Sequence, residues 1–306
     1  ADMMEDIESL SPEKSERSAT PARPEPGAAW TFLLCIATAL TVLTYLEDAT
    51  RCLTMWHDQQ AFVAKHAGVP SFLAGAMLLL VATIQLLSPL LIVPTARVPS
   101  FALPVMVESV AIAVSIIMQP FLFNQLSNAE LLSLSLAQLG ATGLIFAEAH
   151  FVAYPRKSPF AAHLATADAY KSADSVAWVQ LTSRLMLTVD LTITFGMRLL
   201  GVLLGWNEDY DSHAAMVMSS ATCVLVLTAG AMVWFGFKTT ASASMIALAC
   251  LSDAFFRFPF WTSVSSASAD VLRFHFFQAM TPVGGLLLLV ALGPGRFSYD
   301  SHSKTK

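Results

Sequence analysis

The residues best able to do chemistry in this chain are charged side chains inside long apolar stretches. Asp48 and Arg51 are three residues apart, and Asp253 and Arg257 are four apart. Residues at these spacings share one face of a helix. Further charged residues lie in or beside other apolar stretches: Glu47, Glu108, Glu148, Arg184 and Asp190. An ionisable group at the bilayer centre costs about 2.5–3.5 kcal/mol on insertion scales, so each group requires a partner or water.

These charges have two interpretations. The functional one is a polar cavity or a proton path within a helical bundle. The structural one is a set of ion pairs that fix how helices pack, together with residues near the membrane surface. We favour the structural interpretation, because the acids form no close catalytic pair in sequence and no nucleophile lies beside a base.

The histidines and cysteines do not predict a metal or cofactor site. The seven histidines are scattered, and none lies at helical spacing from another. A zinc site needs several such ligands close together. The four cysteines, Cys35, Cys52, Cys223 and Cys250, also lack the close spacing of a metal site or a disulfide framework. The sequence therefore predicts no catalytic residue, no cofactor and no metal.

The composition predicts a membrane protein. Of the 306 residues, 55% are hydrophobic and 13% are charged, and the mean hydropathy is +0.61. Soluble domains carry about 25% charged residues, and a soluble protein of this size has too little interior to bury so much apolar surface. Lipid must therefore cover much of it. The net charge of −5 and the lack of a basic patch give no indication of nucleic-acid binding.

The apolar runs are continuous and long enough for helices that cross a bilayer, which need about 20 residues each. We predict an all-α, polytopic transmembrane helical bundle with seven to eight spans, eight being favoured. The predicted spans are residues 28–46, 71–93, 101–122, 131–152, 181–204, 213–235, 241–261 and 274–292. We expect a short surface helix near 165–176, within the long loop 153–180.

Three regions follow from this pattern: a polar N-terminal tail (1–27), a transmembrane helical domain (28–295) and a polar C-terminal tail (296–306). With eight spans, both tails lie on one side. That side carries Lys14, Arg17, Arg23, Arg97, Arg156, Lys157, Lys171, Lys238, Arg296, Lys304 and Lys306, and the other only Arg51, Lys65, Arg198, Arg257 and Arg273. Basic residues favour the cytosolic or matrix side, so we expect both termini there.

Four segments carry motifs beyond simple apolarity: Thr44–Arg51 (TYLEDATR), Gln180–Leu185 (QLTSRL), Phe235–Ala243 (FGFKTTASA) and Phe276–Gly295 (FFQAMTPVGGLLLLVALGPG). In this order they resemble the surfeit locus protein 4 family, within a DoxX-like membrane superfamily. The resemblance rests on these residues: Glu47, Asp48, Arg51, Glu148, Arg184, Gly236, Phe237, Lys238, Phe260, Trp261, Phe276, Phe277, Gln278, Gly284, Gly285, Gly293, Pro294 and Gly295. Independently of the family, the Gly284–Gly285 pair predicts close helix packing.

The resemblance implies a non-enzymatic cargo receptor that cycles between the endoplasmic reticulum and the Golgi. Such a receptor binds soluble secretory cargo on the luminal side, near the exposed N-terminus of the cargo protein. In the cytosol it binds coat proteins. The resemblance also places Glu47, Asp48 and Arg51 at the luminal face. One departure is the sequence SHSKTK, in which the lysine spacing differs from the dilysine retrieval signal common in the family.

The alternative function is a non-catalytic accessory subunit of a large organelle membrane complex, such as a respiratory assembly in the mitochondrial inner membrane. Reuse of a receptor scaffold is compatible with this fold, because fold does not fix function. Two weaker alternatives are a redox enzyme related to DoxX proteins and a transporter of a small solute. No cysteine or histidine pair supports the redox enzyme, whereas buried acids are compatible with an ion path.

Overall fold

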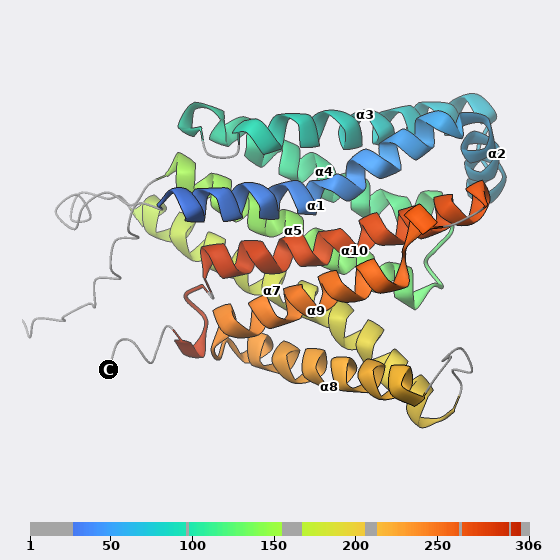
Figure 1. The fold of residues 1–306 in the computed structure, drawn as a ribbon. Helices are drawn as coiled ribbons and strands as arrows, with labels where there is room; N and C mark the ends of the chain where they lie inside the picture. Colours follow the sequence, from blue (N-terminus) through green and yellow to red (C-terminus); the bar gives the residue numbers. More distant parts are fainter. Residues whose placement is uncertain are drawn as a thin grey trace, which may run out of the picture.

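The computed structural model describes residues 27–95, 98–154, 167–205, 213–262, 265–293 and 295–300. Its elements are almost all helical (Figure 1). The long helices are α1 (Ala28–Thr54), α2 (Trp56–Ala67), α3 (Ser71–Thr95), α4 (Ala102–Leu122), α5 (Ala129–Ala153), α7 (Ala167–Leu203), α8 (His213–Phe235), α9 (Thr239–Arg257) and α10 (Ser266–Leu292). Short 3₁₀ turns lie at Pro99–Phe101 and Phe260–Thr262.

Eight of the described helices are long and apolar enough to cross a membrane, which confirms the predicted polytopic bundle. Their large apolar side chains face outward as well as inward; Phe32, Phe72, Leu103, Phe121 and Phe256 are all exposed. In water such a surface would be strongly unfavourable. The chain is therefore a multi-pass membrane protein whose outer surface contacts lipid.

Two predicted boundaries are wrong. The first span does not end at residue 46, because α1 continues to Thr54, and the following segment forms the short helix α2. The predicted surface helix near 165–176 is not a separate element. Helix α7 begins at Ala167 and continues without a break to Leu203. Polar residues had suggested a boundary there, but residues 167–180 contain no proline or glycine to end the helix.

The helices form two groups that meet along α10 and α5. Helices α1, α3, α4 and α5 pack as neighbours, as do α7, α8, α9 and α10. Helix α10 contacts α1, α9 and α5 and is the most buried of the spans. It is drawn in red through the middle of Figure 1.

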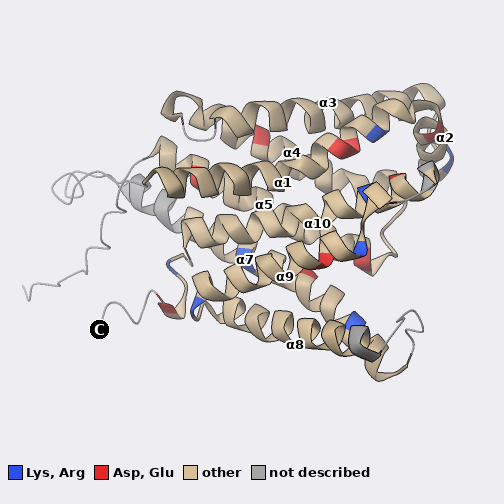
Figure 2. Cartoon of the chain, in the orientation of Figure 1, with Lys and Arg blue, Asp and Glu red and all other residues tan. Residues whose placement is uncertain are grey.

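The bundle has two distinct ends. The start of α1, the end of α10 and residues 295–300 lie together at one end, on the left of Figure 1, which we call the terminal end. The opposite end, which includes α2 and the start of α10, is called the far end. Figure 2 shows more positions occupied by charged residues in the half toward the far end than in the rest of the described bundle. The termini of the described membrane domain share one side, as eight spans require.

Small and hydroxyl-bearing residues fill the interior where helices α1 and α10 cross. Thr44 Oγ1 donates to the Phe277 carbonyl, and its hydroxyl lies 2.7 Å from that of Thr281. Gly284 lies directly against the backbone of Thr41. Small residues allow helix backbones in membranes to approach closely, and hydroxyl groups bond across the contact. The close packing predicted for Gly284–Gly285 is therefore confirmed.

Candidate functional site

Some of the predicted motif residues lie in two clusters, one at each end of the bundle, together with residues that the motifs did not include. The far-end cluster consists of Glu47, Arg51, Asp270, Arg273 and Phe274. The C-terminal clasp, at the terminal end, consists of Arg184, Gly236, Lys238, Phe297 and Asp300. The hydrogen bonds that join different elements in these clusters connect residues 61 to 226 apart in sequence. The packing of α1 with α10, and of α7 with the α8–α9 turn, brings these residues together.

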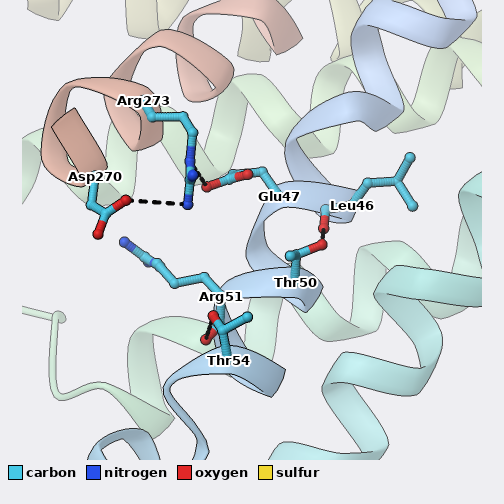
Figure 3. A network of polar contacts seen from close by, with 7 residues as sticks. All are labelled: Leu46, Glu47, Thr50, Arg51, Thr54, Asp270 and Arg273. Atoms are coloured by element: carbon cyan, nitrogen blue, oxygen red, sulfur yellow. Dashed lines mark hydrogen bonds and ion pairs between the residues drawn. The ribbon is translucent and has the colours of Figure 1, made fainter. Parts of the chain in front are cut away.

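The far-end cluster is a network of opposite charges between α1 and α10 (Figure 3). Arg273 Nε donates to Glu47 Oε1 at 2.9 Å, and its Nη2 lies 3.5 Å from Asp270 Oδ1. The Arg51 guanidinium lies over the Phe274 ring at 3.8 Å, and its side chain points toward Asp270 in Figure 3. The Arg273 side chain is 37% exposed. Charges of both signs are thus accessible to a partner at this end.

Aromatic side chains support the start of α10 beside this cluster. Phe276 packs edge-on against Phe255, Phe260 and Trp261, and Phe277 also contacts Phe260. The predicted motif residues Phe260, Trp261, Phe276 and Phe277 therefore belong to one aromatic group. Such groups are common at the membrane–water interface. We therefore interpret this group as packing that positions the start of α10, and not as a cofactor site.

Asp48 does not join its neighbours in the far-end cluster. It is only 7% exposed, and its Oδ2 accepts a 3.5 Å hydrogen bond from Gln119 Nε2 of α4. Asp48 and Arg51 are near each other on α1, as predicted, but Arg51 packs over Phe274 instead. The two neighbouring carboxylates thus have different surroundings. Glu47 forms an ion pair with Arg273, whereas Asp48 points into the interior.

In the C-terminal clasp, residues 295–300 fold back over the turn between α8 and α9. Arg184, which is 2% exposed, donates from Nη2 to the Phe297 carbonyl at 3.0 Å. Asp300 N–H donates to the Gly236 carbonyl at 3.0 Å. The Asp300 carboxylate accepts from the backbone N–H groups of Lys238 and Thr239, both at 2.9 Å. Asp300 therefore caps the N-terminus of α9 in place of a side chain of α9 itself.

Gly236 and Lys238 form the turn that the clasp holds. Gly236 has φ +69°, and its N–H and that of Phe237 bond back to the Val233 and Met232 carbonyls, a pattern that ends helices. A Cβ on Gly236 would lie 2.5 Å from the Ser298 side chain and 2.9 Å from Arg184 Nη1. The FGFKTT motif thus supplies a turn tight enough for the C-terminal segment to dock.

Replacing Asp300 with Ala should shorten the stable part of α9. The substitution removes both acceptors from the N–H groups of Lys238 and Thr239, and loss of such a cap costs about 1 kcal/mol. Hydrogen–deuterium exchange should show faster exchange in the first turn of α9. The variant Asp300→Asn should retain most of the protection, because an amide oxygen still accepts. Equal exchange in the wild type and in Asp300→Ala would exclude the cap.

The remaining membrane charges form structural contacts. Arg198 and Asp253 make a bidentate pair between α7 and α9, at 2.8 and 3.1 Å. Asp253 is therefore joined to α7, whereas Arg257, on its own helix, lies over Phe258. Asp190 accepts from Ser133 of α5 at 2.9 Å. These contacts agree with the structural interpretation of the membrane charges.

Other predicted motif residues have supporting positions. Gly293 ends α10 with φ +82°, and Gly295 packs against the side chain of Gln180. Gly285 packs against Leu187 and Ala141, and Glu148 and Gln278 are half-buried in α5 and α10. Pro294 lies outside the described residues.

The comparisons with known proteins identify the family. The model of the SURF4 family matches residues 28–306. The chain belongs to the SURF4 family. Two curated relatives are each called a surfeit locus protein 4 homolog. The one from Schizosaccharomyces pombe is 26% identical over 87% of this chain and 80% of its own length. The one from Drosophila melanogaster is 26% identical over 88% and 89%. No solved structure gives a significant match.

SURF4 family membership accounts for the order of the motifs, and the structure adds residues that the motifs did not identify. Asp270, Arg273 and Phe274 complete the far-end cluster, and Phe297 and Asp300 complete the clasp. Asp270 and Arg273 lie three apart just before the Phe276–Phe277 pair. This spacing could have signalled one helical face, but not that Glu47 was its partner.

Proposed function

We propose that this protein is a surfeit-locus-4-like cargo receptor that carries soluble secretory proteins from the endoplasmic reticulum to the Golgi. The observation that carries the proposal is the far-end cluster. Glu47, Arg51, Asp270 and Arg273 lie together with partly exposed side chains, on the side with fewer basic residues. By the positive-inside rule that side faces the lumen. Paired charges that are not deeply buried can exchange partners with a charged peptide.

The terminal end supports the cytosolic half of the proposal. The C-terminal clasp positions residues 295–300 against the α8–α9 turn, so the chain leaves the bundle at a defined place on the side rich in Lys and Arg. In a receptor, that side would contact coat proteins. A docked segment loses less conformational entropy on binding than a free one.

Neutralising the far-end acids should weaken cargo binding. In Glu47→Gln combined with Asp270→Asn, Arg273 loses both carboxylate partners and the cluster changes from mixed to positive charge. We expect about tenfold less secretory cargo in affinity purification from detergent, which corresponds to about 1.4 kcal/mol of binding free energy. Glu130→Gln is the matched control, because Glu130 is an exposed acid at the far end, outside the cluster.

Purification of the wild type decides the proposal itself. Recovery of secretory proteins and coat components would support it, and recovery of neither would reject the receptor function. Co-migration of all the protein with a large membrane complex on native gels, with mitochondrial residence, would instead establish the alternative of an accessory subunit. A tag on the C-terminus that faced the lumen would contradict the orientation assigned to the far-end cluster.

A further inference from the structure

A row of buried and half-buried polar side chains lies in the interior between α1, α3 and α4. It contains Asp48 on α1, Gln85 and Ser88 on α3, and Ser115 and Gln119 on α4. Gln85, Ser88 and Ser115 have no exposed surface, and Asp48 is almost fully buried. The row is separate from the far-end cluster, because Asp48 turns inward to Gln119 while Glu47 turns to Arg273.

Helix geometry brings the row together. Val81 lies one turn before Gln85 on α3, and Cys52 lies one turn after Asp48 on α1. Val81 and Cys52 belong to the same apolar cluster, with Leu122 of α4. Helices α1 and α3 run in opposite directions (Figure 1). Asp48 and Gln85, each one turn further into the bundle, therefore face the same interior.

Several polar atoms in this row have no protein partner. Asp48 Oδ1 and both amide atoms of Gln85 are inaccessible and make no hydrogen bond within the part of the chain that the structure describes. The bond from Gln119 to Asp48 Oδ2 is long, at 3.5 Å. An unsatisfied polar group is unfavourable in a protein interior, and more so where the group is charged. Such groups in native proteins are normally satisfied by buried water.

Asp190 provides an internal comparison. It is also a buried carboxyl group in a spanning helix, but it accepts hydrogen bonds from Ser133 at 2.9 Å and Thr194 at 3.5 Å. Asp48 lies nearer the far end, yet it has only the long contact with Gln119. Burial alone therefore does not distinguish Asp48. What distinguishes Asp48 is that polar atoms in its row lack hydrogen-bond partners among the described residues.

We propose that the interior between α1, α3 and α4 is a water-filled proton-binding site, in which Asp48 carries the proton. Water bonded to the Gln85 amide and to Asp48 Oδ1 satisfies the groups that the protein leaves unpaired. A proton from bulk solvent, relayed through this water, neutralises the carboxylate, so no charge has to be held at this depth. The same proton returns to water when the site ionises, and no other reactant is consumed.

The charged groups around Asp48 do not replace the proton. Helix α3 (Ser71–Thr95) contributes no titratable side chain. The other titratable or charged groups on the elements packed around this interior, α1, α2 and α4, and on α10 at the adjoining far-end cluster, are Cys35, Tyr45, Glu47, Arg51, Cys52, His57, Asp58, Lys65, His66, Glu108, Asp270, Arg273 and His275. Of the two nearest charges, Glu47 is paired with Arg273 and Arg51 lies over Phe274. Glu108 accepts from Ser88 at the deeper end of the row.

Infrared spectroscopy of the full-length protein in lipid nanodiscs tests the proposal. We expect a protonated carboxyl band that disappears in Asp48→Asn, is lost at alkaline pH, and shifts in D₂O because the proton exchanges with water. Asp190→Asn is the matched control and should leave this band unchanged. If Asp48→Asn does not fold, Asp48→Glu should move the band without removing it.

A second substitution tests the proposed water in the site. Gln85→Leu removes the amide that would hold water and should slow the D₂O shift of the Asp48 band. Three results would overturn the proposal: no Asp48 band from acidic to alkaline pH, a band that does not shift in D₂O, or exchange in Gln85→Leu as fast as in the wild type. The readout involves no cargo, so it is independent of the receptor function.

Discussion

Gly284→Ala should prevent α10 from packing against α1 and leave little stably folded protein. A Cβ at this position would lie 2.5 Å from the backbone nitrogen and the hydroxyl of Thr41, and 2.7 Å from the Ala37 carbonyl. Two of these three atoms are backbone, so no side-chain rotation relieves the clash and the helices must separate. Overpacking a dense interior costs about 1–3 kcal/mol, and rigid contacts place this site at or above that range.

Thermal aggregation in detergent, followed by size-exclusion chromatography, measures the effect. Gly196→Ala is the matched control, because Gly196 lies in the spanning helix α7 and a Cβ there would meet no atom within 4 Å. Alanine favours helix over glycine by about 1 kcal/mol, so the control should be as stable as the wild type or more so. Equal melting of the two variants would show that α1 and α10 can separate at little cost.

Arg184→Met should release the C-terminal segment and destabilise the terminal end of the bundle. Arg184 is among the largest fully buried side chains in the described residues, and its guanidinium bonds to the Phe297 carbonyl and packs against Gly236. The methionine keeps much of the stem but loses the charged donor. A hydrogen bond from a charged group contributes about 1.5–3 kcal/mol, and the remaining void adds to the loss.

Limited proteolysis distinguishes release of the segment from general unfolding. Proteolytic cleavage within residues 295–300 should become fast in Arg184→Met, while the helices stay protected. Arg184→Lys should give an intermediate rate, because an ammonium keeps the charge but not the planar donor group. Lys65→Met, at an exposed position of α2, removes a cation outside the clasp and should cleave like the wild type. A wild-type rate in Arg184→Met would mean that the segment is held by other contacts.

The two clusters give the motifs of this family separate physical tasks. The clasp joins α7, the α8–α9 turn and residues 295–300, and it consists mainly of hydrogen bonds that join the buried Arg184 and the half-buried Asp300 to backbone groups. The far-end cluster joins α1 to α10 through partly exposed charges. A buried contact of this kind maintains the fold, whereas an exposed one can also meet a partner. The proposed cargo binding therefore belongs to the far end, whereas the clasp contributes to assembly of the bundle.

Some features followed directly from local sequence. Apolar runs of about 20 residues predicted the eight spans, because the bilayer sets the length of a helix independently of its neighbours. The Gly284–Gly285 pair predicted a close helix crossing for an equally local reason. Helix ends were less accurate: α1 continues to Thr54 through polar residues, because a polar side chain at the membrane surface gives no signal that the helix stops.

The sequence by itself therefore determined the number of spans, their helical nature and the family, since each depends on short segments and their order. The tertiary structure decided which charges meet. Asp253 pairs with Arg198 rather than with Arg257 on its own helix, Glu47 with Arg273, and Arg184 with the Phe297 carbonyl. Partners 55 to 226 residues apart leave no local pattern. Only the packing of helices brings them within hydrogen-bonding distance.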